Sequence, residues 1–257
     1  MTYLDQETAC MKIIPGRLYR CNVCVFSFVW PRTARAIDNS YFAEHRKHFK
    51  TTSHEDLEKR FSSIVHEIEM HSHRSKGSLL DVGCGKGLFL LHMKQKGWDV
   101  TGIEPVKESA DHARTLGLNI INVVLEHAKL PQEHFDVVHL SHVLEHVADP
   151  VGCMLRVSGL LKKRGLVVIE VPHEFGPLTM KIRKAFHALP QFPMPSAHVS
   201  FFTPATLKEV IKRSRLTVVS LKTFHESTSI RDFLKLHRLF DYAFHTGPRI
   251  RAYALKG

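Results

Sequence analysis

A glycine turn at residues 79–89 constrains the fold of this chain more than any other feature. The segment reads Leu-Leu-Asp-Val-Gly-Cys-Gly-Lys-Gly-Leu-Phe: an apolar strand that ends in the carboxylate of Asp81, three alternating glycines, and the start of a helix. Gly83 and Gly85 can adopt positive φ and, because they have no Cβ, let a ligand lie directly against the backbone. The turn therefore predicts a binding site for a nucleoside-sized ligand at a strand–helix junction.

The spacing of the glycines decides between nucleotide ligands. A dinucleotide fingerprint needs its third glycine three places after the second, where this chain has Leu88; its third glycine is Gly87. NAD and FAD are therefore disfavoured. A second apolar strand, 98–103, leads into Glu104, roughly twenty residues past the first glycine, where a carboxylate can accept hydrogen bonds from both ribose hydroxyls. Glu104 is accordingly predicted to contact the ligand.

Further motifs follow the turn in a regular order. Gly-Ile-Glu-Pro closes the second strand at residues 102–105, Phe-Asp-Val-Val at 135–138 begins another strand, and Leu-Glu-His-Val follows at 144–147. This order resembles that of the class I S-adenosylmethionine-dependent methyltransferases. The resemblance implies an α/β fold with a Rossmann-like, doubly wound, mostly parallel seven-stranded sheet and an antiparallel last strand. It also implies a methyltransferase that uses S-adenosyl-L-methionine as its cofactor.

The resemblance and the strand ends together name the residues expected to contact the cofactor. Ser141 directly follows a strand, and ligands of open α/β sheets bind at the carboxyl ends of the strands. Glu126 follows the third expected strand, where related enzymes place an acidic or polar residue on the adenine or its ribose, although the Gly-Asp pair that is frequent there is absent. The expected cofactor contacts are Asp81, Gly83, Gly85, Glu104, Glu126 and Ser141.

Three histidines are candidates for a catalytic base. Methyl transfer from a sulfonium requires no nucleophilic residue, but a hydroxyl acceptor benefits from a base, and histidine suits that role near neutral pH. His142 follows the strand 135–140, His173 lies just beyond the strand 166–172, and His198 closes the segment after it. We therefore expect the base, if the acceptor needs one, among His142, His173 and His198.

A metal-binding pattern overlaps one of these histidines. His142-x-x-Glu145-His146 spells the inverted zinc-protease motif. A zinc peptidase would carry this motif within a longer helix and would need a further ligand, whereas here an apolar strand directly precedes it. We therefore predict no catalytic metal. In the resembled family this segment supports the loop, which implies a structural role for Glu145 and His146.

Residues 1–53 read as an otherwise irregular N-terminal extension that carries one motif. Cys21 and Cys24 form a C-x-x-C pair, which can offer two thiolates to a metal, whereas a structural zinc site needs four ligands. In a subgroup of the resembled methyltransferases an N-terminal knuckle carries two such pairs. Two interpretations stay open here: a degenerate, truncated knuckle, or a working site completed by Cys10 and a histidine. The five cysteines are odd in number and scattered, so they form no disulfide framework.

Size and charge place further bounds on the protein. A chain of 257 residues, 44% of them hydrophobic, fits one α/β domain with extensions, and residues 54–257 are assigned to it. The sequence has no apolar run of transmembrane length and no basic-then-apolar signal at its start, so we expect a cytoplasmic protein. The formal net charge of +11 lies entirely in residues 160–257, which contain 17 Lys and Arg against 6 Asp and Glu.

An insertion at residues 174–200 follows the fifth expected strand, where the resembled family often builds a lid over the acceptor. Its stretch 178–189 is amphipathic and carries Lys181, Arg183 and Lys184. Positive potential over a cleft concentrates anionic partners, so we predict a small or lipid-linked, anionic acceptor that is methylated on oxygen or nitrogen. The same stretch could equally rest on an anionic membrane surface, or be a solvated face without a ligand.

The run His-Val-Ser-Phe-Phe-Thr-Pro at 198–204 resembles a branch that contains ubiquinone-pathway O-methyltransferases and glycan-associated methyltransferases, with Thr203 expected to cap the next helix. Two other functions stay open. One is a catalytically inactive, cofactor-binding regulatory homologue, because the usual adenine contacts are missing. The other is an RNA methyltransferase that binds phosphates through its basic part, although the chain lacks an N-P-P-Y type of catalytic loop.

Overall fold

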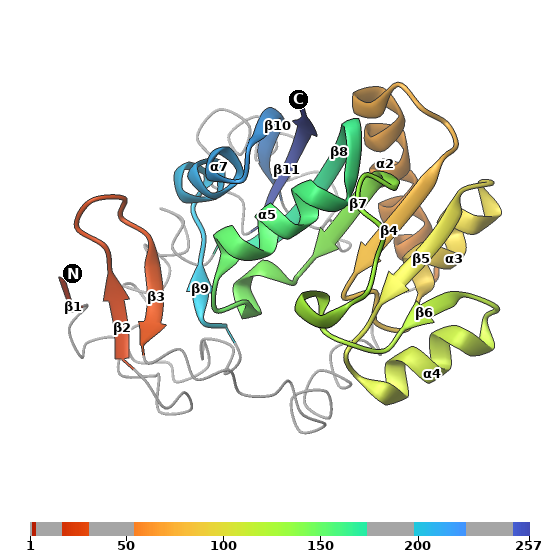
Figure 1. Cartoon of the computed structure of the whole chain (residues 1–257), viewed down its shortest axis with the longest axis horizontal. Coiled ribbons are helices and arrows are strands. Elements are labelled where there is room, and N and C mark those ends of the chain that lie inside the picture. The colour runs from red at the N-terminus through yellow and green to blue at the C-terminus, as the bar shows by residue number, and fades with distance from the viewer. Residues whose placement is uncertain (1, 4–16, 31–53, 174–197, 225–248) are drawn as a thin grey trace.

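The computed structural model describes residues 2–3, 17–30, 54–173, 198–224 and 249–257 (Figure 1). Its strands are β1 (Thr2–Tyr3), β2 (Arg17–Arg20), β3 (Ser27–Trp30), β4 (Ser78–Val82), β5 (Asp99–Ile103), β6 (Asn119–Ile121), β7 (Phe135–Ser141), β8 (Leu161–Pro172), β9 (Ser200–Phe201), β10 (Leu216–Phe224) and β11 (Arg249–Lys256). Its helices are α2 (His54–Ser72), α3 (Leu88–Gln95), α4 (Lys107–Thr115), α5 (Pro150–Leu160) and α7 (Pro204–Arg213), with the 3-10 turns η3 (Leu125–His127) and η4 (Leu144–His146).

Seven strands form the main sheet in the order β10-β11-β8-β7-β4-β5-β6. The neighbours from β8 to β6 pair in parallel, whereas β11 pairs antiparallel with both β8 and β10. The predicted doubly wound, mostly parallel sheet with an antiparallel last strand is therefore confirmed. From β4 the chain proceeds outward to β5 and β6, and from β7 it proceeds the other way to β8. Ligands of open α/β sheets bind at such a switch point.

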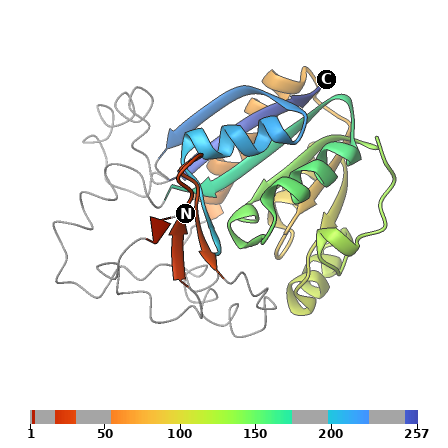
Figure 2. The same cartoon turned by 60° about the vertical axis from the view of Figure 1, so that its left-hand side comes forward.

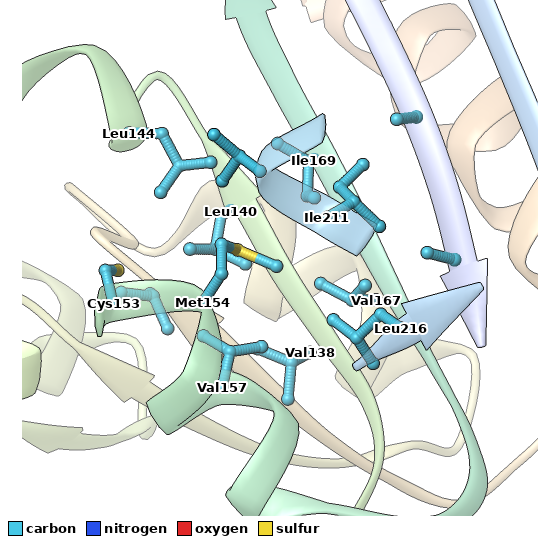
Figure 3. Close-up of a cluster of buried hydrophobic side chains, with 14 of the residues drawn as sticks. Val138, Leu140, Leu144, Cys153, Met154, Val157, Val167, Ile169, Ile211 and Leu216 are labelled. Carbon is cyan, nitrogen blue, oxygen red and sulfur yellow. The ribbon is translucent and has the colours of Figure 1, made fainter. Parts of the chain in front are cut away.

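Helices cover both faces of this sheet, so its central strands are buried on both sides. On one face, Val138 belongs to the apolar cluster that also contains Met154 of α5 and Ile211 of α7 (Figure 3). On the other face, the adjacent Val137 belongs to the cluster that contains Ile68 of α2. Successive side chains of a strand point to opposite faces, which is why neighbouring valines join different cores. The carboxyl ends of the strands are thereby fixed between two packed layers.

A second, smaller sheet has the order β1-β2-β3-β9. The irregular structure expected for residues 1–53 is therefore wrong over β2 and β3, which form an antiparallel hairpin. In β3, Ser27 pairs with Phe201 of β9, and the Phe26 ring lies 5.4 Å from the Phe202 ring, centroid to centroid. Figures 1 and 2 show this hairpin beside β9, away from the edge strand β6. The N-terminal extension thus supports the segment that leads into α7.

The start of α7 follows the predicted cap. The Thr203 side chain accepts a hydrogen bond from the backbone N–H of Thr206 at 3.3 Å, and the Thr206 hydroxyl accepts one from the N–H of Thr203 at 2.9 Å. This reciprocal pair is a capping box, and Pro204 occupies the first helical position, where its missing N–H costs nothing. The expectation for Thr203 is confirmed.

The predicted lid is described only from His198 onward, and the basic residues Lys181, Arg183 and Lys184 lie outside the described residues, as does Cys10. Among the helices of the described ranges, none is long and apolar enough to cross a membrane.

Candidate functional site

The glycine turn follows the carboxyl end of β4 and leads into α3. Gly83, Gly85 and Gly87 have φ of 71°, 55° and 78°, the left-handed region predicted for the first two. A Cβ at Gly83 would lie 2.7 Å from the Val143 side chain, and one at Gly87 would lie 2.6 Å from that of Leu118. A Cβ at Gly85 would meet no protein atom within 4 Å. The protein therefore packs against the first and third glycines, and the space beside Gly85 is open to a ligand.

Glu104 holds this turn from the end of β5. Its carboxylate is buried and accepts hydrogen bonds from the backbone N–H of Gly85 at 2.8 Å and of Val106 at 2.9 Å. Burial raises the pKa of the Glu104 carboxyl, and the nearby charge of Asp81 adds to this, while the two backbone hydrogen bonds oppose it. Each carboxylate oxygen keeps a further lone pair, so Glu104 can also accept hydrogen bonds from two hydroxyls of a ligand.

Asp81 has a partner that the sequence did not reveal. Its Oδ1 lies 2.7 Å from Nδ1 of His139 in β7, and both side chains are buried. The register of the two strands places these residues directly beside each other, and the Phe89 ring of α3 packs on the imidazole at 4.3 Å. His139 reads in the sequence as one polar residue of a core strand, and only the strand pairing shows that it faces Asp81.

His142 and Ser141 stand at the carboxyl end of β7, as predicted. The His142 backbone has φ of 57°, and the side chain is 36% exposed, so a substrate can reach it. Its Nδ1 lies 3.0 Å from Oε1 of Glu145, and its Nε2 lies 3.7 Å from Oε1 of Glu170. Ser141 is half-buried and pairs in register with Glu170.

Glu145 orients this imidazole. The carboxylate is fully buried, which opposes ionisation, yet the hydrogen bond from His142 and the charges of His142, His146 and His198 lower the pKa of Glu145 to about 2. The ionised carboxylate accepts the Nδ1–H of His142, which leaves Nε2 to accept a proton. The supporting role predicted for this segment fits a second contact, since the backbone N–H of Val199 donates to the Glu145 carbonyl at 2.8 Å.

His198 reaches the same carboxylate from a distant part of the chain. The His146 and His198 rings lie 4.8 Å apart, and Glu145, His146 and His198 each offer one ligand atom, all within 4.8 Å of one another. This set could hold a metal ion, for which a carboxylate and two imidazoles are suitable ligands. The set differs from the His142-x-x-Glu145-His146 motif, because His198 takes the place of His142. The absence of a catalytic metal stays a prediction, which elemental analysis of the purified protein tests.

The remaining predicted site residues lie further out. His173 is buried just beyond the end of β8. Glu126 lies exposed on η3, after the end of β6. Among the three candidate bases, the structure thus brings His142 and His198 to Glu145.

A buried cluster of charges borders His142. Glu170 accepts hydrogen bonds from Nε and an amino group of Arg251 at 3.0 and 2.8 Å, from Arg60 at 2.9 Å and from Arg249 at 3.2 Å. Burial alone would raise the pKa of Glu170, but the charges of Arg251, Arg60, His142 and Arg249 hold it far below its usual range. The sequence signal was an acidic residue inside an otherwise apolar strand, which predicts a buried partner without naming it.

The chain is similar to several known proteins. The family described as "Methyltransferase domain" matches residues 53–221. The ubiquinone biosynthesis O-methyltransferase of Vibrio parahaemolyticus is 29% identical over 185 residues, which are 65% of this chain and 76% of that protein. The protein of the same name from Cereibacter sphaeroides is 33% identical over 156 residues, which are 56% of this chain but only 62% of that protein. A solved SAM-dependent methyltransferase from Archaeoglobus fulgidus has a TM-score of 0.59 at 21% identity, covering 85% of this chain and 100% of that one.

Proposed function

This chain belongs to the class I S-adenosylmethionine-dependent methyltransferases, and from that membership we propose that it methylates oxygen or nitrogen on a small or lipid-linked, anionic acceptor. The observation that carries the donor site is the open turn at Gly85 beside the Glu104 carboxylate. Backbone at Gly85 can approach the donor closely, and Glu104 would hold its ribose hydroxyls. The bound donor supplies a methyl group on a sulfonium.

The residues around β7 support a base on the acceptor side. His142 Nε2 would take the proton of an acceptor hydroxyl as the new bond to carbon forms, while Nδ1–H stays bonded to Glu145. The imidazolium that results lies between the carboxylates of Glu145 and Glu170, at 3.0 and 3.7 Å, which stabilise its charge. Such a base contributes about 10²- to 10⁴-fold, and alignment of the reactants can supply roughly 7–11 kcal/mol.

Charge supports an anionic acceptor. Glu170, which lies 3.7 Å from His142, is surrounded by Arg60, Arg249 and Arg251, and Lys222 pairs with Glu67. Arg60 and Arg249 keep 27% and 25% of their side chains exposed, so their positive potential reaches the solvent at the acceptor end of the sheet. The relatives named as ubiquinone biosynthesis O-methyltransferases favour oxygen as the acceptor atom.

The test is transfer of a labelled methyl group from S-adenosylmethionine into metabolite and lipid extracts, repeated with His142→Asn. Asparagine tolerates positive φ, so this variant should keep the backbone of the loop. We expect at least a hundredfold lower kcat with unchanged donor affinity, because the proton acceptor is lost while the donor site is intact. His134→Asn is the matched control, since His134 is exposed at the opposite end of β7.

Three outcomes of this test would change the proposal. A His142→Asn variant with the wild-type kcat would show that His142 is not the base, without contradicting methyl transfer. Label that enters only uncharged acceptors would refute the anionic acceptor. Donor binding without transfer to any extract would favour a regulatory, cofactor-binding protein.

The turn itself gives a paired prediction. Gly85→Ala should weaken S-adenosylmethionine binding at least tenfold, because its Cβ would project into the open space that the donor occupies. Gly87→Ala should instead lower the free energy of unfolding, because its Cβ would press on Leu118 and Ala113. Both alanines adopt positive φ, which costs about 1–2 kcal/mol and so serves as a shared baseline. In calorimetry, Gly85→Ala should show the larger loss of donor affinity, and in urea unfolding, Gly87→Ala should show the larger loss of stability. If one variant is the more affected in both measurements, the assignment of Gly85 to the donor and of Gly87 to packing is contradicted.

A further inference from the structure

A buried histidine in the central strand β7 makes a single hydrogen bond within the described parts of the chain. The Nδ1 atom of His139 lies 2.7 Å from Oδ1 of Asp81, and both side chains are buried. The other ring nitrogen, Nε2, is also buried, and no described group is its hydrogen-bond partner. An ionised carboxylate only accepts hydrogen bonds, so Nδ1 carries the hydrogen and donates it to Asp81. The polar contact of this imidazole is therefore directed at Asp81.

Strand geometry places this pair directly below the donor site. β4 and β7 are neighbours in the sheet, and Asp81 and His139 are paired in register. Two residues further along the chain, Gly83 follows Asp81 and Ser141 follows His139. These two residues stand at the carboxyl ends of the strands, where ligands of open α/β sheets bind. The Asp81–His139 pair therefore lies one layer of side chains below the strand ends that face the donor.

The charge of Asp81 acts on the glycine turn. Burial raises the pKa of the Cys84 thiol and of the Glu104 carboxyl, and the nearby charge of Asp81 raises both further. Asp81 thus lies close to a residue inside the turn and to the residue expected on the ribose. His139 binds one carboxylate oxygen, Oδ1, and thereby fixes the direction of the other, Oδ2. A carboxylate held in this way suits a donor that carries positive charge on a sulfonium and an ammonium group.

A second buried histidine resembles His139 but lies outside the donor site. The Nδ1 atom of His92 in α3 lies 3.3 Å from Oε2 of Glu58, and its Nε2 is buried without a partner among the described residues. The His92 ring lies 5.7 Å from the Phe61 ring, much as the His139 ring lies 4.3 Å from that of Phe89. Glu58, however, is 46% exposed on α2 and belongs to no strand end. His92 is therefore a matched control for His139.

We propose that His139 is a positioning residue of the donor site, whose Nδ1–H fixes the Asp81 carboxylate so that Oδ2 faces S-adenosylmethionine. This role rests on the proposed function, since it requires that the donor binds at the glycine turn. A buried nitrogen without a partner lowers stability, and a leucine or valine would suit the apolar strand around position 139 better. Departures from the rules of stability concentrate at functional sites, which favours a role in binding over one in folding.

Calorimetry of the full chain with S-adenosylhomocysteine tests this role through two variants of nearly the same shape. Leucine and asparagine branch at the same carbon, so both leave the same space beside Phe89, but only the asparagine amide can donate a hydrogen bond to Asp81. We expect His139→Leu to bind at least tenfold more weakly than the wild type, and His139→Asn to stay within threefold of it. The control His92→Leu should also stay within threefold.

A further pair of variants separates positioning from packing. Asp81→Ala has no carboxylate for His139 to orient, so adding His139→Leu to it should change the affinity less than threefold. If His139 acted through packing alone, His139→Leu would reduce the affinity by the same factor with Asp81 present or absent. Urea unfolding establishes that each variant is folded before its affinity is measured.

Three results would overturn the positioning role: wild-type affinity in His139→Leu, an equal loss of affinity in His139→Leu and His139→Asn, or an equal effect of His139→Leu with and without Asp81. If His139→Leu does not fold, His139→Asn decides alone, since affinity within threefold of the wild type supports the role and a tenfold loss in the folded variant overturns it. A wild type that does not bind S-adenosylhomocysteine would refute the donor site itself, and the role of His139 with it.

Discussion

Binding of S-adenosylmethionine is expected to weaken at least tenfold when Glu104 is replaced by glutamine. The carboxylate lies at the end of β5, where it accepts hydrogen bonds from Gly85 and Val106 and can take two more from the ribose hydroxyls of the donor. Hydrogen bonds to a charged group contribute about 1.5–3 kcal/mol each, and a tenfold change corresponds to about 1.4 kcal/mol. The amide turns one acceptor oxygen into a donor that faces a backbone N–H, so both the turn and the ligand lose contacts.

Calorimetry with S-adenosylmethionine and S-adenosylhomocysteine measures the effect, with Glu209→Gln on the exposed face of α7 as the control. Because the pKa of Glu104 is raised, this carboxylate becomes protonated at a higher pH than an ordinary glutamate does. The affinity of the wild type for the donor should therefore fall on acidification from that higher pH, and the affinity of Glu104→Gln should not show this pH dependence. Equal affinity of variant and wild type would contradict the assignment of Glu104 to the donor.

Stability should drop by about 3–5 kcal/mol when Glu170 becomes glutamine, because Arg251, Arg60 and Arg249 then lose the charge they surround. Arg251 is only 5% exposed, so water cannot replace the lost carboxylate. Urea unfolding followed by tryptophan fluorescence measures the change, since Trp98 is buried in the native state. Glu133→Gln, which breaks an exposed pair with Lys256, should change stability by about 1 kcal/mol or less.

The pH dependence provides an independent check on Glu170. Its folded pKa is depressed, so its contribution is complete above the unfolded value of about 4.3 and is lost as the pH falls toward the folded value. The stability difference between wild type and Glu170→Gln should therefore be full at neutral pH and shrink below about pH 4. A difference that stays constant into acid would mean that Glu170 acts through packing rather than charge.

The parts of the structure that could be predicted are those encoded over short stretches of sequence. The glycine turn was predicted from the spacing of its glycines, and the capping of α7 was predicted because Thr203 directly precedes Pro204. Glu104 was predicted from its distance to the turn, and the structure places it in contact with Gly85.

The parts that could not be predicted depend on strands that are distant in sequence. His139 meets Asp81 across 58 residues, and Glu170 meets Arg251 across 81. The hydrophobic pattern of the sequence does not predict such pairs, because each partner alone is one polar residue among apolar ones. The same holds for His198, which lies close to Glu145 where the Val199 N–H donates to the Glu145 carbonyl.

The antiparallel strand β11 has a consequence for synthesis on the ribosome. It lies between β8 and β10, yet it follows both in the chain, so neither can complete its pairing until residues 249–256 have left the exit tunnel. At about 5–20 residues per second, translation from the end of β8 to β11 takes roughly 4–15 seconds. During that interval the apolar edge of β8, from Leu166 to Val171, has no neighbour on one side. Nascent chains on adjacent ribosomes therefore present matching open edges, and slower initiation or chaperone binding should raise the soluble yield.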